Sequence, residues 1–380
     1  MPNHKDRDHA LLSASSSSRW LACPPSAVAN EAYPNQDTAF TQEGTTAHEV
    51  AEIIARARLE DGSEPHEMSY PNGFNREMIE CAKAYADYIE EQKKSNDATV
   101  LLEQRVDFSA WVPDGFGTCD CLIIQDDTLT VIDYKYGQGV AVSATNNPQL
   151  RLYALGAMYE YGDVLGITKI EMHIFQPRLN NISTDSITAD ELYEWADKTV
   201  KPTAEKAIKG KGKYCPGEHC RFCQHAGKCR ALTKTCTEYL DIHGAKVGLP
   251  VLAPYEVADV LRMEPLISLW LKKVKEQALT TLMNGEELPG YKLVEGKLGN
   301  RKWKNEMEVA ATLGKLYTSD IYTETRLLSP SQMDKAIGKK KVAELLDELI
   351  ERAPGAPTIA PIHDKRPAYN RLAEAQDDFK

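Results

Sequence analysis

The sequence contains no long apolar run. No stretch approaches the roughly 20 apolar residues that a transmembrane helix requires. The polar segment Met1–Ala10 is followed by no apolar signal-peptide region. These absences predict a protein with no membrane partner. We therefore expect it in the cytoplasm, which is the bacterial host's cytoplasm if a phage encodes the chain.

Cysteine and positive charge are also scarce. Nine cysteines in 380 residues are too few for a disulfide scaffold, and in a reducing compartment clustered cysteines are more often metal ligands or redox groups. The formal net charge of −11 disfavours a protein that coats nucleic acid through a basic surface. It leaves open an enzyme with a local DNA groove, because only the charge near the phosphates matters there.

The composition that remains is that of a globular protein, with 42% hydrophobic and 27% charged residues. The length suits a core domain with a substantial appendage. We predict a disordered tail over residues 1–12, a core domain over residues 13–235 and a C-terminal extension over residues 250–370.

The core domain has the pattern of an α/β fold. Apolar residues at helical spacing predict helices over residues 43–58, 75–94, 147–161 and 188–208, the last interrupted at Pro202. Short β-branched runs bounded by turn residues predict strands over residues 99–108, 117–124, 128–134 and 167–176. This order predicts a mixed central sheet flanked by helices. The extension is predicted to be mainly helical, with a helix over residues 254–283 that Pro265 bends or splits.

Two carboxylates and a lysine stand on the second and third predicted strands. Asp133 and Lys135 are two residues apart and project from one face of a strand, and a tight turn lets antiparallel pairing bring Asp120 beside Asp133. Converging carboxylates repel unless a cation lies between them, and Mg²⁺ prefers such oxygen ligands. A neighbouring lysine would position a water molecule or stabilise charge on a phosphate. Alone, these residues would equally suit a solvated strand face.

Three further residues accompany this group. His48 lies on the first long helix, where a neutral imidazole can complete a metal site. Gln149 and Tyr153 are one helical turn apart and share a face, from which both can hydrogen-bond a phosphate or a metal-bound water. Each of these residues by itself also fits ordinary packing.

Taken in order, the patterns G-T-x-x-H, G-x-x-D, D-x-K and Q-x-x-x-Y resemble the RecB-like branch of the PD-(D/E)XK nucleases. The resemblance covers residues 13–231. It implies a restriction-endonuclease-like core and a Mg²⁺- or Mn²⁺-dependent deoxyribonuclease. The roles that it implies are metal ligands at His48, Asp120 and Asp133, the catalytic lysine at Lys135, and the accessory motif at Gln149 and Tyr153.

A cysteine cluster follows the predicted core, and its spacing fits two kinds of metal site. Three thiols within ten residues in a cytosolic protein indicate a metal site more than coincidence. A zinc site would take its ligands locally, from Cys215, Cys220, Cys223 and Cys229, with His219 or His225 as substitutes. An iron–sulfur site would take three of these cysteines and a distant fourth, Cys23.

The resemblance favours the iron–sulfur site. In AddB-type and CRISPR-associated RecB-like nucleases, one cysteine precedes the nuclease core and three follow it. This implies a [4Fe–4S] cluster held by Cys23, Cys220, Cys223 and Cys229. Such a clip would close a loop of nearly the whole core domain and stabilise it, with no redox step in the chemistry.

The extension holds a basic and aromatic stretch. Arg301, Lys302, Trp303 and Lys304 combine cations with a ring, as single-strand grooves do, and they equally fit a charged turn. The extension is therefore a candidate DNA-binding or assembly region.

The whole chain resembles a phage and prophage family of RecB-like proteins. This implies an exonuclease that acts on DNA ends or single strands in phage recombination or DNA processing, with a single-strand annealing recombination protein as a candidate partner and an oligomer as a candidate assembly. Two other classes stay open: an iron–sulfur or zinc DNA-binding accessory protein with little or no cleavage, and a zinc-binding interaction module.

Overall fold

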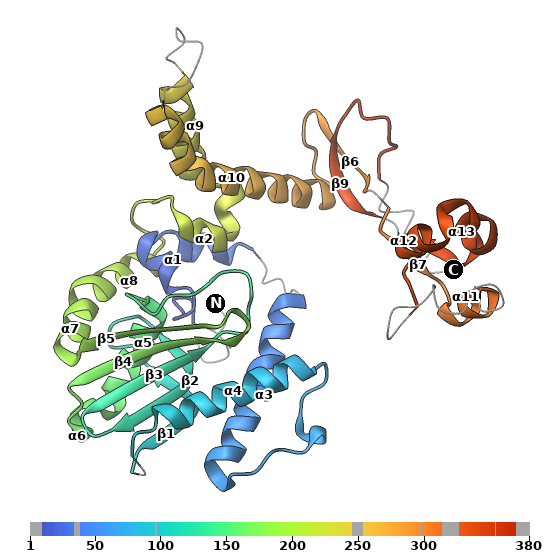
Figure 1. The fold of residues 1–380 in the computed structure, drawn as a ribbon. Coiled ribbons are helices and arrows are strands. Elements are labelled where there is room, and N and C mark those ends of the chain that lie inside the picture. The colour runs from blue at the N-terminus through green and yellow to red at the C-terminus, as the bar shows by residue number, and fades with distance from the viewer. Residues whose placement is uncertain are drawn as a thin grey trace. The chain divides into compact units, whose positions relative to one another are not determined.

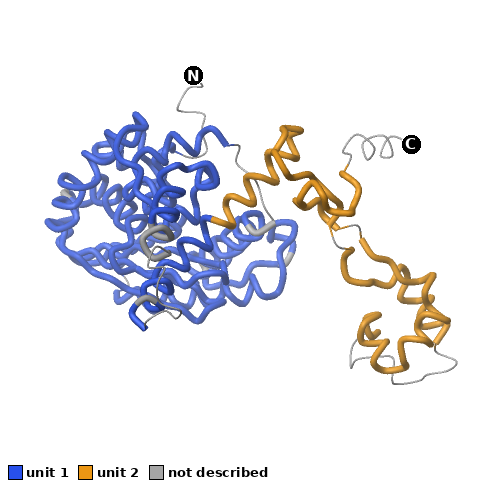
Figure 2. Tube along the Cα trace, turned by 90° about the horizontal axis from the view of Figure 1, so that it is seen from above, with its two compact units in different colours: residues 1–270 blue, residues 271–380 orange. Residues whose placement is uncertain are grey.

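The computed structural model describes residues 10–33, 39–95, 97–244, 254–296, 298–313, 327–353 and 355–369. The chain divides into two compact units, residues 1–270 and 271–380 (Figure 2). Unit 1 therefore extends beyond the predicted core domain. Among the described residues, no helix is both long and apolar enough to cross a membrane.

Unit 1 is built on a five-stranded mixed sheet in the order β1-β2-β3-β4-β5 (Figure 1). The strands are β1 (Thr99–Asp107), β2 (Phe116–Gln125), β3 (Thr128–Tyr134), β4 (Lys169–Gln176) and β5 (Asn181–Thr188). β3 and β4 run parallel, and every other neighbouring pair is antiparallel. The chain crosses from β3 to β4 through α5 (Pro148–Ala157). The predicted α/β class with a mixed central sheet is confirmed.

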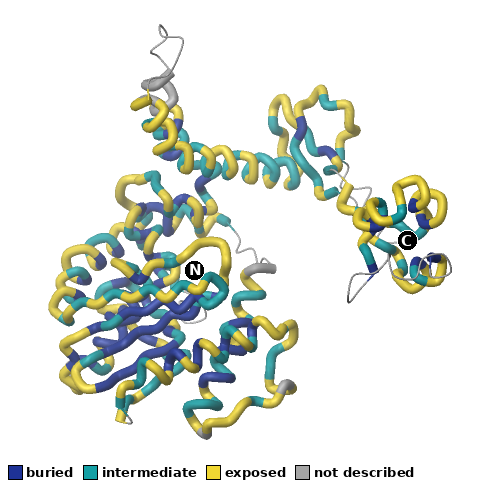
Figure 3. Tube along the Cα trace, viewed as in Figure 1, coloured by how far each residue is buried: buried dark blue, intermediate teal, exposed yellow. Residues whose placement is uncertain are grey.

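Helices cover both faces of this sheet, as the alternation of strand side chains requires. On one face, α3 (Ala39–Asp61) and α4 (Arg76–Gln92) pack against Ile123 and Ile132. On the other face, α5 packs against Leu122 and Val131 together with α1 (Ser17–Ala22), α7 (Ala189–Trp195) and α8 (Lys201–Ala207). The central strands are accordingly buried along most of their length (Figure 3).

Unit 1 differs from the predictions in two places and agrees with them in a third. The fifth strand, β5, was missed because it is an edge strand whose side chains alternate between half-buried and exposed, which leaves a weak apolar signal. The predicted tail is wrong at its end, because Leu12 is fully buried in the core; residues 1–9 lie outside the described residues. The predicted interruption near Pro202 is confirmed, because a π-helical turn at Ala196–Val200 separates α7 from α8.

The end of unit 1 forms a small cluster of its own. The elements concerned are α2 (Ser26–Glu31), η6 (Glu218–Phe222), η7 (Gln224–Lys228), α9 (Arg230–Gly244) and the start of α10 (Pro254–Met283). Buried side chains from η6, η7 and α9 meet Trp270 of α10, and Trp270 Nε1 donates to Thr233 Oγ1 at 3.2 Å. Pro265 lies inside α10 without splitting it. The remaining short elements are η2 (Glu67–Ser69), η3 (Met158–Gly162), α6 (Asp163–Leu165) and η4 (Pro177–Leu179).

Unit 2 is less helical than predicted, because it contains two two-stranded antiparallel sheets. One pairs β6 (Tyr291–Gly296) with β9 (Gly355–Pro361), and the other pairs β7 (Arg301–Trp303) with β8 (Ile350–Arg352). Its helical elements are α11 (Glu306–Leu313), α12 (Pro330–Met333), η8 (Asp334–Gly338), α13 (Lys339–Leu346) and η9 (Asp347–Leu349). Val309, Met333 and Val342 belong to its small apolar core.

Candidate active site

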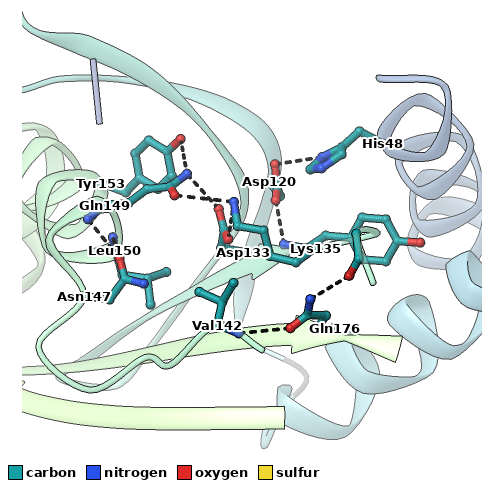
Figure 4. A network of polar contacts seen from close by, with 12 residues as sticks. His48, Asp120, Asp133, Lys135, Val142, Asn147, Gln149, Leu150, Tyr153 and Gln176 are labelled. Carbon is teal, nitrogen blue, oxygen red and sulfur yellow. Dashed lines mark hydrogen bonds and ion pairs between the residues drawn. The ribbon is translucent and has the colours of Figure 1, made fainter. Parts of the chain in front are cut away.

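The site lies where strands β2 and β3 separate. The final residue pair of their ladder is Cys121 with Ile132, so Asp120 and Asp133 stand opposite each other one residue beyond it. The Tyr134 N–H donates to Asp120 Oδ2 at 2.6 Å, so a carboxylate oxygen takes the place that a strand carbonyl would hold. The separation of the strands therefore brings two carboxylates together at the sheet face (Figure 4).

His48 reaches this point from α3. Its Nδ1 lies 3.3 Å from Asp120 Oδ1, and its ring meets Tyr134 edge-on with the centroids 5.3 Å apart. Burial by itself would lower the pKa of His48, but the adjacent Asp120 carboxylate raises it overall. Burial would raise the pKa of Asp120, but the charges of His48 and Lys135 and the Tyr134 N–H hold it below its usual value.

Asp133 is held by residues from two elements. Lys135 Nζ lies 2.8 Å from Asp133 Oδ2. Gln149, near the start of α5, donates through Nε2 to Asp133 Oδ1 and to the Tyr153 hydroxyl, both at 3.1 Å, and its Oε1 accepts from Lys135 Nζ at 3.4 Å. The Asn147 side chain caps α5 by accepting from the Gln149 N–H. The helix cap thus fixes the residue that aligns the lysine with the carboxylate.

Asp133 is nearly enclosed, with 3% of its side chain exposed. Burial raises its pKa, against the charge of Lys135. Among the described residues, the partner of Asp133 Oδ2 is the Lys135 ammonium 2.8 Å away, and this oxygen has no other hydrogen-bond donor. This buried oxygen retains the capacity to bind a cation.

Glu103 belongs to the same site, although the motifs did not include it. One carboxylate oxygen of Glu103, a ring nitrogen of His48 and an oxygen of Asp120 lie within 4.8 Å of one another. Burial and then the charge of Asp120 raise the pKa of Glu103 to about 7. The available signal was the register of β1 against β2, which places Glu103 opposite Asp120.

The glycine of the G-x-x-D pattern makes room for Tyr153. A Cβ atom at Gly117 would lie 2.8 Å from Tyr153 Cε1, which is closer than side-chain carbons tolerate. Tyr153 is nearly buried, and burial raises its pKa well above the usual value. It therefore stays a neutral hydroxyl beside Gln149.

A second site in unit 1 gathers distant cysteines. Cys23, Cys220, Cys223 and Cys229 line one cavity. All nine cysteines of the chain are free thiols. Three N–H donors face the sulfurs, namely Asn30 Nδ2 with Cys223 Sγ at 3.3 Å, and the Cys215 and Gly217 backbone N–H groups with Cys23 Sγ and Cys220 Sγ, each at 3.5 Å. The structure thus brings together the four residues assigned to the iron–sulfur site.

The surroundings of this cavity bear on its ligands. Burial raises the pKa of Cys23 and raises that of Cys220 to about 11, so thiolates here require a nearby positive charge. Arg19 lies near this cavity. Burial lowers the pKa of its guanidinium, and the nearby sulfurs of Cys223 and Cys23 oppose that effect. The guanidinium donates to the Ser26 carbonyl at 2.7 Å.

The residues of the zinc alternative also line this cavity. His219 Nε2 contacts the Cys215 carbonyl at 2.8 Å, and His225 Nδ1 lies 3.3 Å from the Tyr33 hydroxyl. Cys215 itself is exposed. Both histidines therefore have partners within the protein.

Three residues of the basic stretch, Arg301, Trp303 and Lys304, make contacts within unit 2. Trp303 Nε1 donates to the Leu328 carbonyl at 2.8 Å, and the ring packs on the unit 2 core. Arg301 pairs with a carboxylate of η8, and Lys304 Nζ donates to a backbone carbonyl at 2.6 Å. Lys302 is exposed. These contacts give Trp303 a packing role with its ring partly buried, and the DNA contact of this stretch stays a prediction.

Comparison with known proteins adds a family and a solved structure. The family profile described as "Protein of unknown function (DUF2800)" matches residues 9–367. The solved structure described as "Crystal structure of SSO0001" is 13% identical, and the match covers 55% of this chain and 95% of that one, with a TM-score of 0.24. A likeness at this TM-score carries no argument about the site.

Proposed function

The chain belongs to the family described as "Protein of unknown function (DUF2800)", and we propose that it is a Mg²⁺- or Mn²⁺-dependent deoxyribonuclease with a PD-(D/E)XK core of the RecB-like kind. The observation that carries the proposal is that Asp120 and Asp133 lie together where β2 and β3 separate. His48 is 3.3 Å from the Asp120 carboxylate, and Lys135 is 2.8 Å from the Asp133 carboxylate. A structural sheet face does not require two carboxylates, an imidazole and a lysine in contact.

The donor set suits a hard divalent cation. Carboxylate oxygens are the ligands that Mg²⁺ and Mn²⁺ prefer, and among the described residues the buried Asp133 Oδ2 has only the Lys135 ammonium as its partner. Asp120, Asp133 and His48 would hold the ion. When bound, such an ion polarises a phosphoryl oxygen and lowers the pKa of its water.

The remaining residues have roles that follow from their contacts. The Lys135 ammonium is positioned to stabilise the charge that grows on the scissile phosphate, or to hold a water in line with it. Gln149 bridges Lys135, Asp133 and Tyr153 and so keeps the ammonium on the side of the carboxylate. The Tyr153 hydroxyl offers a neutral hydrogen-bond donor to a phosphate oxygen.

The cysteine cavity fits a [4Fe–4S] cluster held by Cys23, Cys220, Cys223 and Cys229. N–H donors that face the sulfurs are the usual support for thiolate ligands. Cys215 of the zinc alternative lines the same cavity but is exposed, and the resemblance favours the larger cluster over zinc. The cluster would tie the N-terminal segment to the end of unit 1.

The substrate proposed from these features is DNA, and the reaction is phosphodiester hydrolysis from ends, as an exonuclease. Work in phage recombination or DNA processing, a single-strand annealing partner and oligomeric assembly are implied by the resemblance alone, and the cytoplasmic location stays a prediction.

The test is a time course on end-labelled linear and closed circular DNA with Mg²⁺, with Mn²⁺ and with EDTA. An exonuclease degrades the linear DNA progressively in either metal, leaves the circle intact and stops in EDTA. Cleavage of the circle would replace exonuclease by endonuclease, and no cleavage of either substrate would favour the DNA-binding accessory protein.

The cluster has its own test in the content of metal per chain. The protein should be brown, with about four irons per chain. Cys229→Ser should lose iron and stability, whereas Cys215→Ser, a cysteine beside the same cavity, should keep both. A colourless protein with stoichiometric zinc would contradict the cluster.

A further inference from the structure

Glu103 and Asp120 form an unfavourable pair on neighbouring strands. The register of β1 against β2 is the same on both sides of them, with Leu102 opposite Cys121 and Gln104 opposite Cys119. Glu103 therefore stands directly opposite Asp120, and side chains opposite each other lie on one face of a sheet, ~5 Å apart at Cβ. Two like charges in this arrangement destabilise the sheet.

The backbone at Glu103 adds a second cost. Its φ is +48°, in the left-handed region that a residue with a side chain adopts at a cost, most of all within a strand. The pair Glu103–Asp120 is accordingly missing from an otherwise continuous ladder. The strained backbone thus carries one carboxylate toward another, with the His48 ring beside both.

A bound cation would offset both the repulsion between Glu103 and Asp120 and the cost of the strained backbone at Glu103. Glu103, Asp120 and the His48 ring offer two oxygens and one nitrogen within 4.8 Å of one another, which is the spacing of ligands around one ion. Asp133 is not a member of this set of three.

We propose that Glu103 is a ligand of the divalent cation, alongside His48 and Asp120. The inference rests on the proposed metal-dependent function, and it adds a third carboxylate to the ligands that the sequence motifs supply. Glu103 raises the negative charge around the ion, and this strengthens binding of a hard cation. Its place on β1 also ties the edge strand of the sheet to the metal site.

The test is the binding of Mn²⁺ alone, without DNA, to the full chain by titration with EPR detection of free Mn²⁺. Glu103→Gln should raise the Kd for Mn²⁺ about tenfold or more, the scale on which removal of a metal-site partner acts. The matched control is Glu52→Gln. Glu52 lies on α3 one turn from His48, and its Oε1 pairs with Arg56 Nη2 at 2.8 Å. The Kd of Glu52→Gln for Mn²⁺ should therefore stay within twofold of the wild-type value. Asp120→Asn should abolish binding.

Thermal unfolding separates a ligand from a merely structural carboxylate. In EDTA, Glu103→Gln should raise the Tm above that of the wild type, because the repulsion with Asp120 is gone. With saturating Mn²⁺, the order should reverse, because the wild type binds the ion more tightly. A lower Tm in both conditions would give Glu103 a structural role and overturn the proposal.

The outcomes distinguish this inference from the proposed function. An unchanged Kd in Glu103→Gln, together with lost binding in Asp120→Asn, would overturn Glu103 as a ligand and leave the nuclease proposal standing. Absence of Mn²⁺ binding by the wild type would overturn both.

Discussion

Replacement of Lys135 by methionine should destabilise the metal-free protein more than replacement of Asp133 by asparagine, although the two residues form one ion pair. The Asp133 side chain is 3% exposed and the Lys135 side chain 27% exposed. Without Lys135, the Asp133 carboxylate stays inside the protein with the Gln149 amide as its donor. Without the carboxylate charge, the Lys135 ammonium can turn toward solvent.

The two costs differ enough to measure. Removing one partner of a buried ion pair costs about 3 to 5 kcal/mol. When the remaining group can reach water, the loss is that of one interaction, about 1 kcal/mol. One kcal/mol lowers the Tm of a domain of roughly 150 to 250 residues by about 2 to 4 °C. We therefore expect a loss of at least about 6 °C for Lys135→Met and of about 2 to 4 °C for Asp133→Asn.

Tryptophan fluorescence in EDTA is the suitable assay. Four of the five tryptophans lie within residues 1–270, so the signal reports mainly on unit 1. The control is Lys94→Met. Lys94 is 65% exposed and pairs with Glu171 at 3.7 Å, and a pair of that kind contributes at most about 1 kcal/mol.

Saturating Mg²⁺ should reduce the loss in Lys135→Met, because a bound cation supplies the missing positive charge. Equal losses in Lys135→Met and Asp133→Asn, or a larger loss in Asp133→Asn, would refute the argument from burial.

Three further predictions follow from particular residues. The pKa of Glu103 is raised by burial from 4.5 to about 7, so the contribution of this group to the stability of the metal-free protein should be fully present below pH 4.5 and be lost as the pH rises to about 7; urea midpoints in EDTA should decline across this range, and Glu103→Gln should flatten the decline. Gly117→Ala should push the Tyr153 ring aside and lower the nuclease rate, whereas Gly137→Ala, where a Cβ meets nothing within 4 Å, should not; equal rates would refute the role of that glycine. Trp303→Ala should lower the Tm of unit 2 by removing a core contact while leaving the affinity for single-stranded DNA unchanged, and a lost affinity in a folded variant would restore the base-stacking interpretation.

Much of the central sheet could be predicted because its strands are apolar and bounded by clear turns. The strand at residues 128–134 was predicted with the bounds that β3 has, and the hairpin before it places Asp120 opposite Asp133. β5 carries no such signal, because an edge strand with one solvated face needs few apolar residues.

The site was predictable where a motif marks a residue and not where only the register does. Asp133 and Lys135 share a strand, so their spacing reveals a common face. Glu103 has no motif, and its place follows from pairing with a strand about 15 residues away and from a backbone conformation that no propensity predicts. Trp303 lies in a composition typical of nucleic-acid grooves, and its ring also packs on a small core, a role that composition alone does not reveal.

The proposed nuclease activity is best tested by substitution of Asp133, with a control substitution on the same hairpin. Asp133→Asn and Asp126→Asn make the same chemical change, and Asp126 is exposed in the β2–β3 turn with a φ of +51°, which asparagine also adopts. With end-labelled linear DNA and Mg²⁺, we predict that the wild type and Asp126→Asn degrade the DNA at equal rates. Asp133→Asn should remain folded and leave the DNA intact. Undiminished degradation by Asp133→Asn would contradict the account.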